Sequence, residues 1–199
     1  MIRIYEKHMK QKLERFISAV ILAVFWPLLL IIAISIKLED GGKIIFTQDR
    51  LGKDKKLFKI YKFRTMKENH DNPDTRTFLG DIRITRVGRI LRKTSLDELP
   101  QLFNILKGDM AIVGPRPILA EEAEYKIEGF SYDKRFSKLP GLFCSIDMKY
   151  RAAADREKQF RMDVAYVENI TFKKDFIIVA KTALTVLRGS NVYAAPRNR

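Results

Sequence analysis

An uninterrupted apolar run, from Phe16 to Ile36, constrains this chain more than any other feature of its sequence. The run contains no charged residue, and roughly 20 apolar residues in a helix are enough to cross the hydrocarbon core of a bilayer. Pro27 lies near its middle, where a proline removes one helical hydrogen bond and clashes with the preceding turn. Three structures fit these facts: a buried core helix, a straight membrane span, and a re-entrant helix that enters one leaflet, bends and returns.

Basic residues flank the apolar run on both sides. Because basic flanks favour the cytoplasmic side of a membrane, the sequence predicts that both ends stay there, and the re-entrant form is favoured. The kink is expected at Trp26-Pro27, with the freed backbone groups satisfied by protein. The start of the chain is not typical of a signal peptide, because its charged region and its apolar run are both too long. The flanking residues are Lys10, Lys12 and Arg15 before the run, and Lys37, Lys43, Arg50, Lys53, Lys55 and Lys56 after it.

A second feature is the octet Thr94 to Gln101, in which two adjacent carboxylates, Asp97 and Glu98, follow several basic residues. Ser95-x-x-Glu98 matches a capping box at a helix start, and an apolar stripe at helical spacing follows it. The same carboxylates, ringed by guanidinium groups, are also suited to acid/base or nucleophilic chemistry on an anionic substrate. The two interpretations are compatible, because anions bind at helix N-termini.

The net charge and the small number of cysteines and histidines limit the possible functions. The formal net charge of +14 indicates an anionic partner: nucleic acid, a phosphorylated metabolite or anionic lipid. A single cysteine, Cys144, excludes an internal disulfide, and the only histidines are His8 and His70. A Ser-His-Asp or Cys-His centre and a zinc site are therefore not expected. A metal, if present, should be a hard cation held by carboxylate and phosphate oxygens.

The rest of the chain predicts short elements. Apolar runs at 43–47 and 57–63, split by Gly52-Lys53-Asp54-Lys55, are typical of a β-hairpin. In Gly114-Pro115-Arg116-Pro117, two prolines fix φ on either side of Arg116, which suits bidentate phosphate recognition. A short strand is expected at 111–113, a loop at 67–77, and helices at 84–91, 118–128, 155–169 and 172–188. The last helix has two interpretations, in the membrane interface or packed on the core.

Six segments form a specific combined pattern. They are Phe46-Thr47-Gln48-x-Arg50-x-Gly52, Lys59-Ile60-Tyr61-Lys62-Phe63-Arg64-Thr65-Met66, Arg83-Ile84-Thr85-Arg86-x-Gly88, Leu91 to Gln101, Asn104-x-Leu106-x-Gly108-Asp109-Met110 and Gly114-Pro115-Arg116-Pro117. Taken together they resemble the bacterial sugar transferase family, the small monotopic phosphoglycosyl transferases.

The resemblance implies an enzyme on the cytoplasmic face of the bacterial inner membrane. Such an enzyme moves a sugar 1-phosphate from a UDP-sugar to polyprenyl (undecaprenyl) phosphate, giving polyprenyl-diphosphate-sugar and UMP in the first membrane step of glycan assembly. It implies Mg²⁺ as cofactor, Asp97 as nucleophile and metal ligand, and Glu98 as partner carboxylate. The phosphate- or nucleotide-binding candidates are Arg92, Arg116, Lys62, Arg64 and Arg151.

Two other functions stay open beside this one. In the first, polyprenyl phosphate attacks the UDP-sugar directly and Asp97 only binds metal. In the second, the chain is a non-catalytic, membrane-bound protein that binds anions; a nucleic-acid partner is not expected, because no recognised nucleic-acid motif is present. The sequence leaves open which sugar is carried, which glycan is built and whether the chain forms a homo-oligomer.

We therefore expect an α+β, mostly helical chain in three parts. Residues 1–38 form a basic N-terminus and the re-entrant membrane helix, residues 39–189 a compact cytoplasmic catalytic domain with a small β-hairpin and interfacial helices, and residues 190–199 a tail. The sequence departs from the family pattern twice. Trp26 stands where the family often has a serine before the kink proline, and residues 142–148 differ from the usual segment after Pro-Gly.

Overall fold

The computed structural model describes residues 5, 9–67, 81–150 and 155–188. Within them the chain is mostly helical, with two small two-stranded sheets, so the α+β prediction is confirmed in outline. Most of the predicted 67–77 loop, the predicted tail and Arg151 lie outside the described residues. The predicted helix at 118–128 is wrong, because only a 3₁₀ turn, η4 (Glu121–Glu124), forms there.

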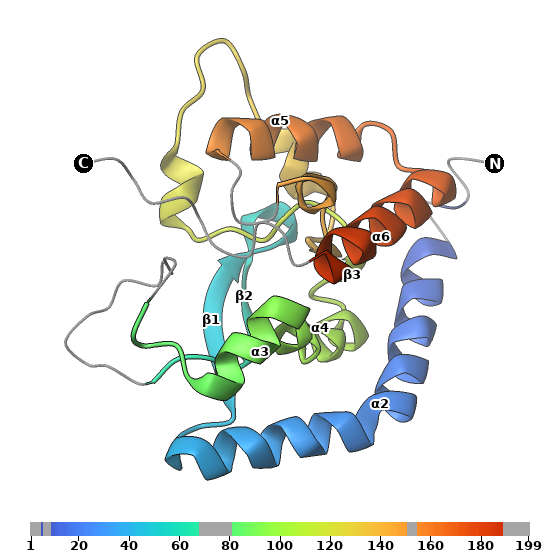
Figure 1. Cartoon of the computed structure of the whole chain (residues 1–199). Coiled ribbons are helices and arrows are strands. Elements are labelled where there is room, and N and C mark those ends of the chain that lie inside the picture. The colour runs from blue at the N-terminus through green and yellow to red at the C-terminus, as the bar shows by residue number, and fades with distance from the viewer. Residues whose placement is uncertain (1–4, 6–8, 68–80, 151–154, 189–199) are drawn as a thin grey trace.

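Helix α2 (Lys10–Asp40) runs through Pro27 and is the one described helix long and apolar enough to cross a membrane, with a mean hydropathy of 2.8. Figure 1 shows it as two limbs that meet at a sharp bend. Since Pro27 is its only proline and prolines are the usual cause of sharp kinks, we assign the bend to Pro27. Only 11% of its most apolar window is buried, so the buried-core alternative is wrong.

The N-terminal end of α2 is fastened to the globular part of the chain by buried polar contacts. Lys10 forms ion pairs with Glu14, one helical turn later, at 2.7 Å, and with Asp175 on helix α6 (Phe172–Leu187). Glu14 accepts a hydrogen bond from the backbone N–H of Val113 at 3.1 Å. The first turn of α2 is thereby tied to both a strand and a helix of the body.

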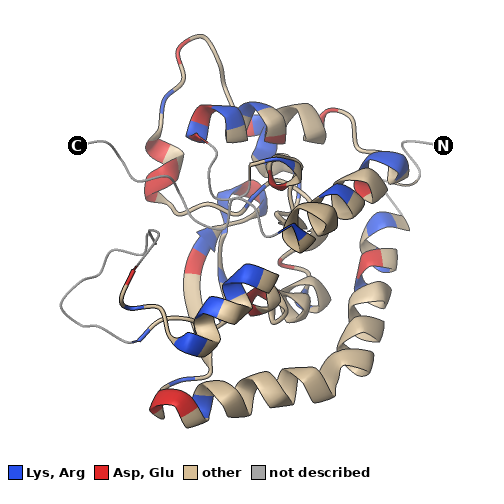
Figure 2. Cartoon of the chain, in the orientation of Figure 1, with Lys and Arg blue, Asp and Glu red and all other residues tan. Residues whose placement is uncertain are grey.

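The C-terminal end of α2 is fastened to the same body by different residues. Glu39 accepts hydrogen bonds from the backbone N–H groups of Arg86 and Val87, at 2.6 and 3.1 Å, and so caps helix α3 (Arg86–Thr94). Asp40 forms an ion pair with the buried Arg64. Figure 2 shows the charged residues of α2 gathered at its two ends, with an uncharged stretch around the bend.

The predicted β-hairpin is present. Strands β1 (Ile45–Leu51) and β2 (Leu57–Phe63) pair antiparallel, and the chain reverses through the short 3₁₀ turn η2 (Lys53–Lys55). Helix α4 (Gln101–Lys107) covers one edge of β2, where the Asn104 side chain accepts from the Tyr61 N–H at 3.1 Å and donates to the Lys59 carbonyl at 2.8 Å. Because unpaired strand groups are costly when buried, this fully buried amide fixes α4 against the hairpin.

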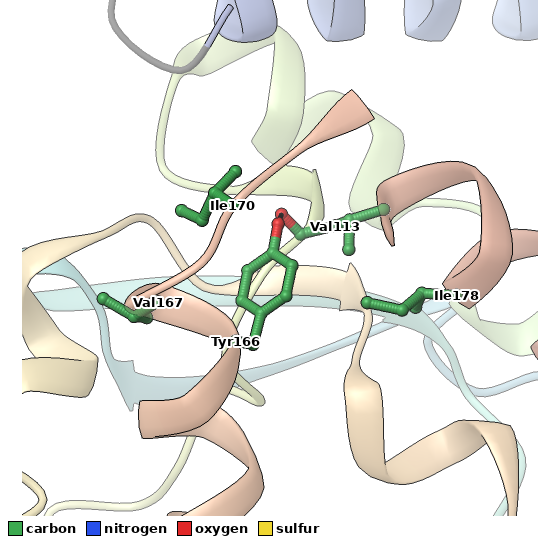
Figure 3. Packing of buried hydrophobic residues seen from close by; sticks show 5 residues of the cluster. All are labelled: Val113, Tyr166, Val167, Ile170 and Ile178. Carbon is green, nitrogen blue, oxygen red and sulfur yellow. Dashed lines mark hydrogen bonds between the residues drawn. The ribbon is translucent and has the colours of Figure 1, made fainter. Parts of the chain in front are cut away.

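The second sheet positions the rigid Pro-Arg-Pro segment. Strand β3 (Ala111–Val113), predicted from sequence, pairs parallel with β4 (Gly141–Phe143). Their ends approach so closely that a Cβ on Gly141 would lie 2.0 Å from the Gly114 nitrogen, so only glycine fits at position 141. Helices α5 (Arg156–Val167) and α6 pack beyond this sheet (Figure 1). Figure 3 shows the cluster that joins them: Val113, Tyr166, Val167, Ile170 and Ile178.

Candidate active site

Asp97 and Glu98 lie in a tight reversal between α3 and α4. Helix α3 ends at Thr94, and the next residue, Ser95, has a left-handed backbone with φ of 58°. The 3₁₀ turn η3 (Leu96–Glu98) follows before α4 begins at Gln101. The capping-box prediction is wrong, because Ser95 terminates one helix and its side chain makes no capping hydrogen bond. A positive φ at a residue other than glycine costs about 1 kcal/mol or more, and such strained turns cluster at functional sites.

The environment of Asp97 tunes its ionisation. Its side chain is half-buried, and burial raises its pKa to about 6; Lys62 and Arg92 oppose this rise, whereas Glu98 adds to it. Asp97 is therefore mostly ionised at neutral pH but only partly hydrated. A carboxylate in this condition is a better nucleophile than one fully surrounded by water, because less hydration must be lost before it reacts.

Two of the predicted cations lie beside this acidic pair. Lys62, on β2, forms a 2.6 Å ion pair with Glu98, and Arg92, on α3, donates from Nε to the Thr65 hydroxyl at 2.8 Å. Both lower the pKa of Asp97. The hairpin and α3 thus bring to the site two of the cations expected from sequence.

Arg116 approaches the acidic pair from the second sheet. Its guanidinium donates to both carboxylate oxygens of Asp147, at 2.9 and 3.1 Å. Asp147 holds the pKa of Arg116 above its usual range, and Glu98 contributes to the same shift, which places Glu98 within electrostatic reach of Arg116. The rigid segment thus holds the Arg116 guanidinium against Asp147, in a position where the charge of Glu98 also acts on it.

A buried ion pair fixes the backbone of Arg116. Arg135 and Asp163 pair at 2.8 Å with side chains 2% and 0% exposed. Asp163 also accepts from the Arg116 N–H at 3.4 Å, and Arg135 donates to the Arg116 carbonyl. The pair clamps the peptide groups on both sides of the Arg116 side chain, a role that no sequence motif indicated.

Two other predicted residues that the structure describes, Arg64 and Trp26, are associated with α2. Arg64 is buried against the end of α2, where it pairs with Asp40 and fills the space beside Gly42. Trp26 lies on α2 with 60% of its surface exposed, next to Pro27 in the apolar stretch. Arg151 falls outside the described residues.

Two residues near the site were not assigned from sequence. Asp147 lies on the 3₁₀ turn η6 (Ser145–Met148), in the segment that departs from the family pattern, and its pairing with Arg116 depends on a fold contact that spacing cannot show. Arg50 belongs to a quoted motif. Side chains alternate between the two faces of a strand, so the register of the hairpin puts Arg50 on the same face as Lys62.

The donor set can be compared with the needs of Mg²⁺. Among the described residues no three acidic, histidine or cysteine side chains gather as a metal cluster. Mg²⁺ is commonly held by one or two carboxylates together with substrate phosphates and water. The adjacent carboxylates of Asp97 and Glu98 therefore fit an ion that is shared with a phosphate ligand.

Comparison with known proteins identifies the class. The sequence model of the family described as bacterial sugar transferase matches residues 5–189. The chain belongs to the bacterial sugar transferase family.

Three curated relatives indicate the chemistry within this family. The chain is 37% identical to a UDP-N-acetylgalactosamine-undecaprenyl-phosphate N-acetylgalactosaminephosphotransferase of Aeromonas hydrophila, over 90% of this chain and 44% of the relative. It is 39% identical to a UDP-glucose:undecaprenyl-phosphate glucose-1-phosphate transferase of Caulobacter vibrioides, over 92% and 72%. It is 37% identical to an undecaprenyl-phosphate galactose phosphotransferase of Salmonella typhimurium, over 94% and 42%. The chain thus spans less than half the length of two of the three.

Proposed function

We propose that this chain is a phosphoglycosyl transferase that moves a sugar 1-phosphate from a UDP-sugar to undecaprenyl phosphate, releasing UMP. The observation that carries the proposal is the half-buried Asp97, ionised at neutral pH and bordered by Lys62, Arg92 and Glu98, on a body fastened to an exposed apolar helix. The names of the relatives agree with this chemistry, and they differ in their sugars, so the sugar carried by this chain is left to experiment.

The proposed first half-reaction is a displacement at phosphorus. A carboxylate oxygen of Asp97 attacks the β-phosphorus of the UDP-sugar, and the bond from that phosphorus to the bridging oxygen breaks, so that UMP leaves with the electron pair. The product is an acyl phosphate that carries the sugar, which divides one difficult transfer into two steps. Lys62 and Arg92 offset the negative charge as one anion approaches another.

The proposed second half-reaction regenerates the carboxylate. A phosphate oxygen of undecaprenyl phosphate attacks the same phosphorus, and the Asp97 carboxylate leaves. A general base is not required, since a phosphate monoester with a second pKa near ~6 is mostly ionised at neutral pH. We assign to Glu98 the orientation of Asp97 or of the metal, in keeping with its ion pair to Lys62.

Mg²⁺ is part of the proposal as the cofactor. Asp97 and Glu98 are the residues that would hold it. When bound, such an ion neutralises phosphate charge during transfer.

We further propose that α2 is re-entrant, with both ends on the cytoplasmic face. Glu14 near one end and Glu39 near the other both bind backbone groups of the same folded body, whereas a straight span would separate its ends by about 30 Å of hydrocarbon. The bend (Figure 1) and the charges confined to the helix ends (Figure 2) support the same topology.

Helix α6 supplies a second membrane contact in this proposal. Four large apolar side chains are exposed on it at helical spacing, between 53% and 83%: Phe172, Phe176, Leu184 and Leu187. Lysines at 173, 174 and 181 accompany this stripe. An apolar stripe with basic neighbours is typical of a helix that lies in the interface of an anionic membrane.

The proposed activity is tested by UMP release from purified protein, supplied with undecaprenyl phosphate, Mg²⁺ and a panel of UDP-sugars. We expect UMP formation with at least one UDP-sugar, and only when both substrates are present for multiple turnover. Absence of UMP with every member of a broad panel would contradict the proposal.

Acid should inhibit the enzyme through Asp97. Since protonated Asp97 cannot attack, kcat/KM for the UDP-sugar should fall about tenfold per pH unit below about pH 6. Replacing Lys62 with Met removes a cation that lowers this pKa, so the acid limb should move to higher pH. A profile that is flat between pH 7.5 and 5, with the fold intact by circular dichroism, would contradict this assignment.

Labelling from one side of the membrane tests the topology. Single cysteines replacing Lys12 and Lys43, near the two ends of α2, should both react with an impermeant maleimide in inside-out vesicles and neither in intact spheroplasts. The unsubstituted chain is the control, because its buried Cys144 should give only background. Reaction of the two sites from opposite sides would mean that α2 spans the bilayer.

A further inference from the structure

Arg50 lies on the face of the hairpin that serves the site. In an antiparallel pair, directly opposed residues point to the same face, and faces alternate along each strand. Arg50 is opposite Phe58. Lys62 is opposite Phe46, which lies four residues before Arg50 on β1 and therefore on the same face. Arg50 and Lys62 therefore share a face, with backbones about 14 Å apart, and Lys62 pairs with Glu98 there.

The surroundings of Arg50 are those of an anion-binding residue. Its side chain is 22% exposed, donates to Gln48 at 2.6 Å and forms a 3.9 Å ion pair with Glu122, but its Nε finds no hydrogen-bond partner among the described residues. Burial lowers its pKa; Glu122 opposes this effect, and Arg116 and Arg156 add to it. Glu122 also pairs with Arg156, so this one carboxylate is shared by two guanidinium groups. An anionic ligand would offset the positive charge that is left near Arg50 and Arg116.

Two groups of cations border the acidic pair. Lys62 and Arg92 act on Asp97. The residue after Arg50, Leu51, pairs with Ile118, two residues after Arg116, through a 2.8 Å backbone hydrogen bond, which brings the two segments side by side. The charge of Glu98 acts on both guanidinium groups. The two groups come from different elements around the same acidic pair, so they can hold different phosphates of one substrate.

The geometry of phosphoryl transfer decides what the second group holds. The attacking and leaving oxygens lie roughly in line on opposite sides of the phosphorus. When Asp97 attacks, the phosphate of the leaving UMP lies opposite Asp97. When Asp97 is itself the leaving group, the acceptor phosphate must attack from that same opposite side, so one position holds the two phosphates in turn.

We propose that Arg50 and Arg116 form a single phosphate site that is used twice, first by the phosphate of the leaving nucleotide and then by the acceptor phosphate. This inference rests on the proposed function and its two half-reactions. It makes Arg50 a phosphate-binding residue, and it makes the nucleotide and the acceptor mutually exclusive.

Substitution of Arg50 tests the shared site. Arg50→Gln should raise KM for both the UDP-sugar and undecaprenyl phosphate, each by about tenfold or more, because a charge-assisted contact is lost in both half-reactions. Arg50→Lys should recover part of both losses. The matched control is Lys59→Gln, an exposed lysine opposite Asp49 on the other face of the hairpin, which should leave both KM values unchanged. A rise in only one KM, or in neither, would overturn the proposal.

Product inhibition of the unsubstituted enzyme tests the same inference without any variant. A single shared site predicts that UMP competes with undecaprenyl phosphate and is non-competitive against the UDP-sugar. Competition with the UDP-sugar alone would indicate separate sites and overturn the proposal. These outcomes differ from failure of the proposed function, in which the unsubstituted enzyme releases no UMP from any UDP-sugar.

Discussion

Asp97→Asn should lower the rate of UMP formation by at least about 1,000-fold. The amide keeps the size of the side chain but lacks the carboxylate oxygen that attacks phosphorus. The acyl phosphate therefore cannot form. The folded state should be little affected, because Asp97 is half-buried and the amide places no unpaired charge in the site. The measurement is UMP release under saturating substrates, with the melting temperature recorded for each protein.

The matched control for Asp97→Asn is Asp133→Asn. Asp133 pairs with Lys55 in an exposed ion pair at 2.7 Å, far along the sequence from the reversal, and its loss should leave the rate within about twofold, since such pairs contribute little. If Asp97→Asn has a rate near that of the unsubstituted protein, Asp97 is not the nucleophile. An intermediate loss, of about tenfold, would favour a metal-binding role for Asp97 and direct attack by the acceptor.

Asp163→Ala should destabilise the fold by about 3–5 kcal/mol, because it leaves the Arg135 guanidinium buried without its counter-charge. For a chain of this size such a loss corresponds to a fall in melting temperature of at least about 6 °C. Activity should fall as well at temperatures where the protein remains folded, since Asp163 and Arg135 together hold the backbone of Arg116. Thermal unfolding followed by circular dichroism measures the first effect.

A double substitution separates the charge of the pair from its shape. Asp163→Leu combined with Arg135→Met replaces both charges with apolar side chains, which often restores or even increases stability. It does not restore the hydrogen bonds to Arg116. We therefore expect recovered melting temperature with activity still reduced. A single-variant loss under about 1 kcal/mol would show that the pair is not the clamp described here.

Local patterns predicted several elements well, because the physics that forms them is local. The charge-free run with Pro27 indicated a bent apolar helix, and α2 (Lys10–Asp40) has that form. The turn residues Gly52 to Lys55 indicated the hairpin, whose second strand has the predicted limits, Leu57–Phe63. The prolines around Arg116 indicated a fixed guanidinium, and in the structure that guanidinium is paired with Asp147.

The features that could not be predicted from sequence depend mostly on contacts between distant parts of the chain. Ser95 was assigned to a helix start because Ser-x-x-Glu is a strong local signal, but α3 ends immediately before it and its backbone is left-handed. The pairing of Arg64 with Asp40 could not be predicted, because Asp40 lies at the end of another element, 24 residues away. Asp147 was not assigned, since nothing in its segment indicates that Arg116 will reach it.

The most direct test of the account is to trap the intermediate on Asp97. Purified enzyme, incubated with its UDP-sugar and Mg²⁺ in the absence of undecaprenyl phosphate and quenched rapidly, is examined by intact-protein and peptide mass spectrometry. The account predicts one equivalent of UMP and a sugar-phosphate adduct on the peptide that contains Asp97, which disappears when undecaprenyl phosphate is added before quenching. Turnover with both substrates, but neither adduct nor UMP without the acceptor, would contradict it.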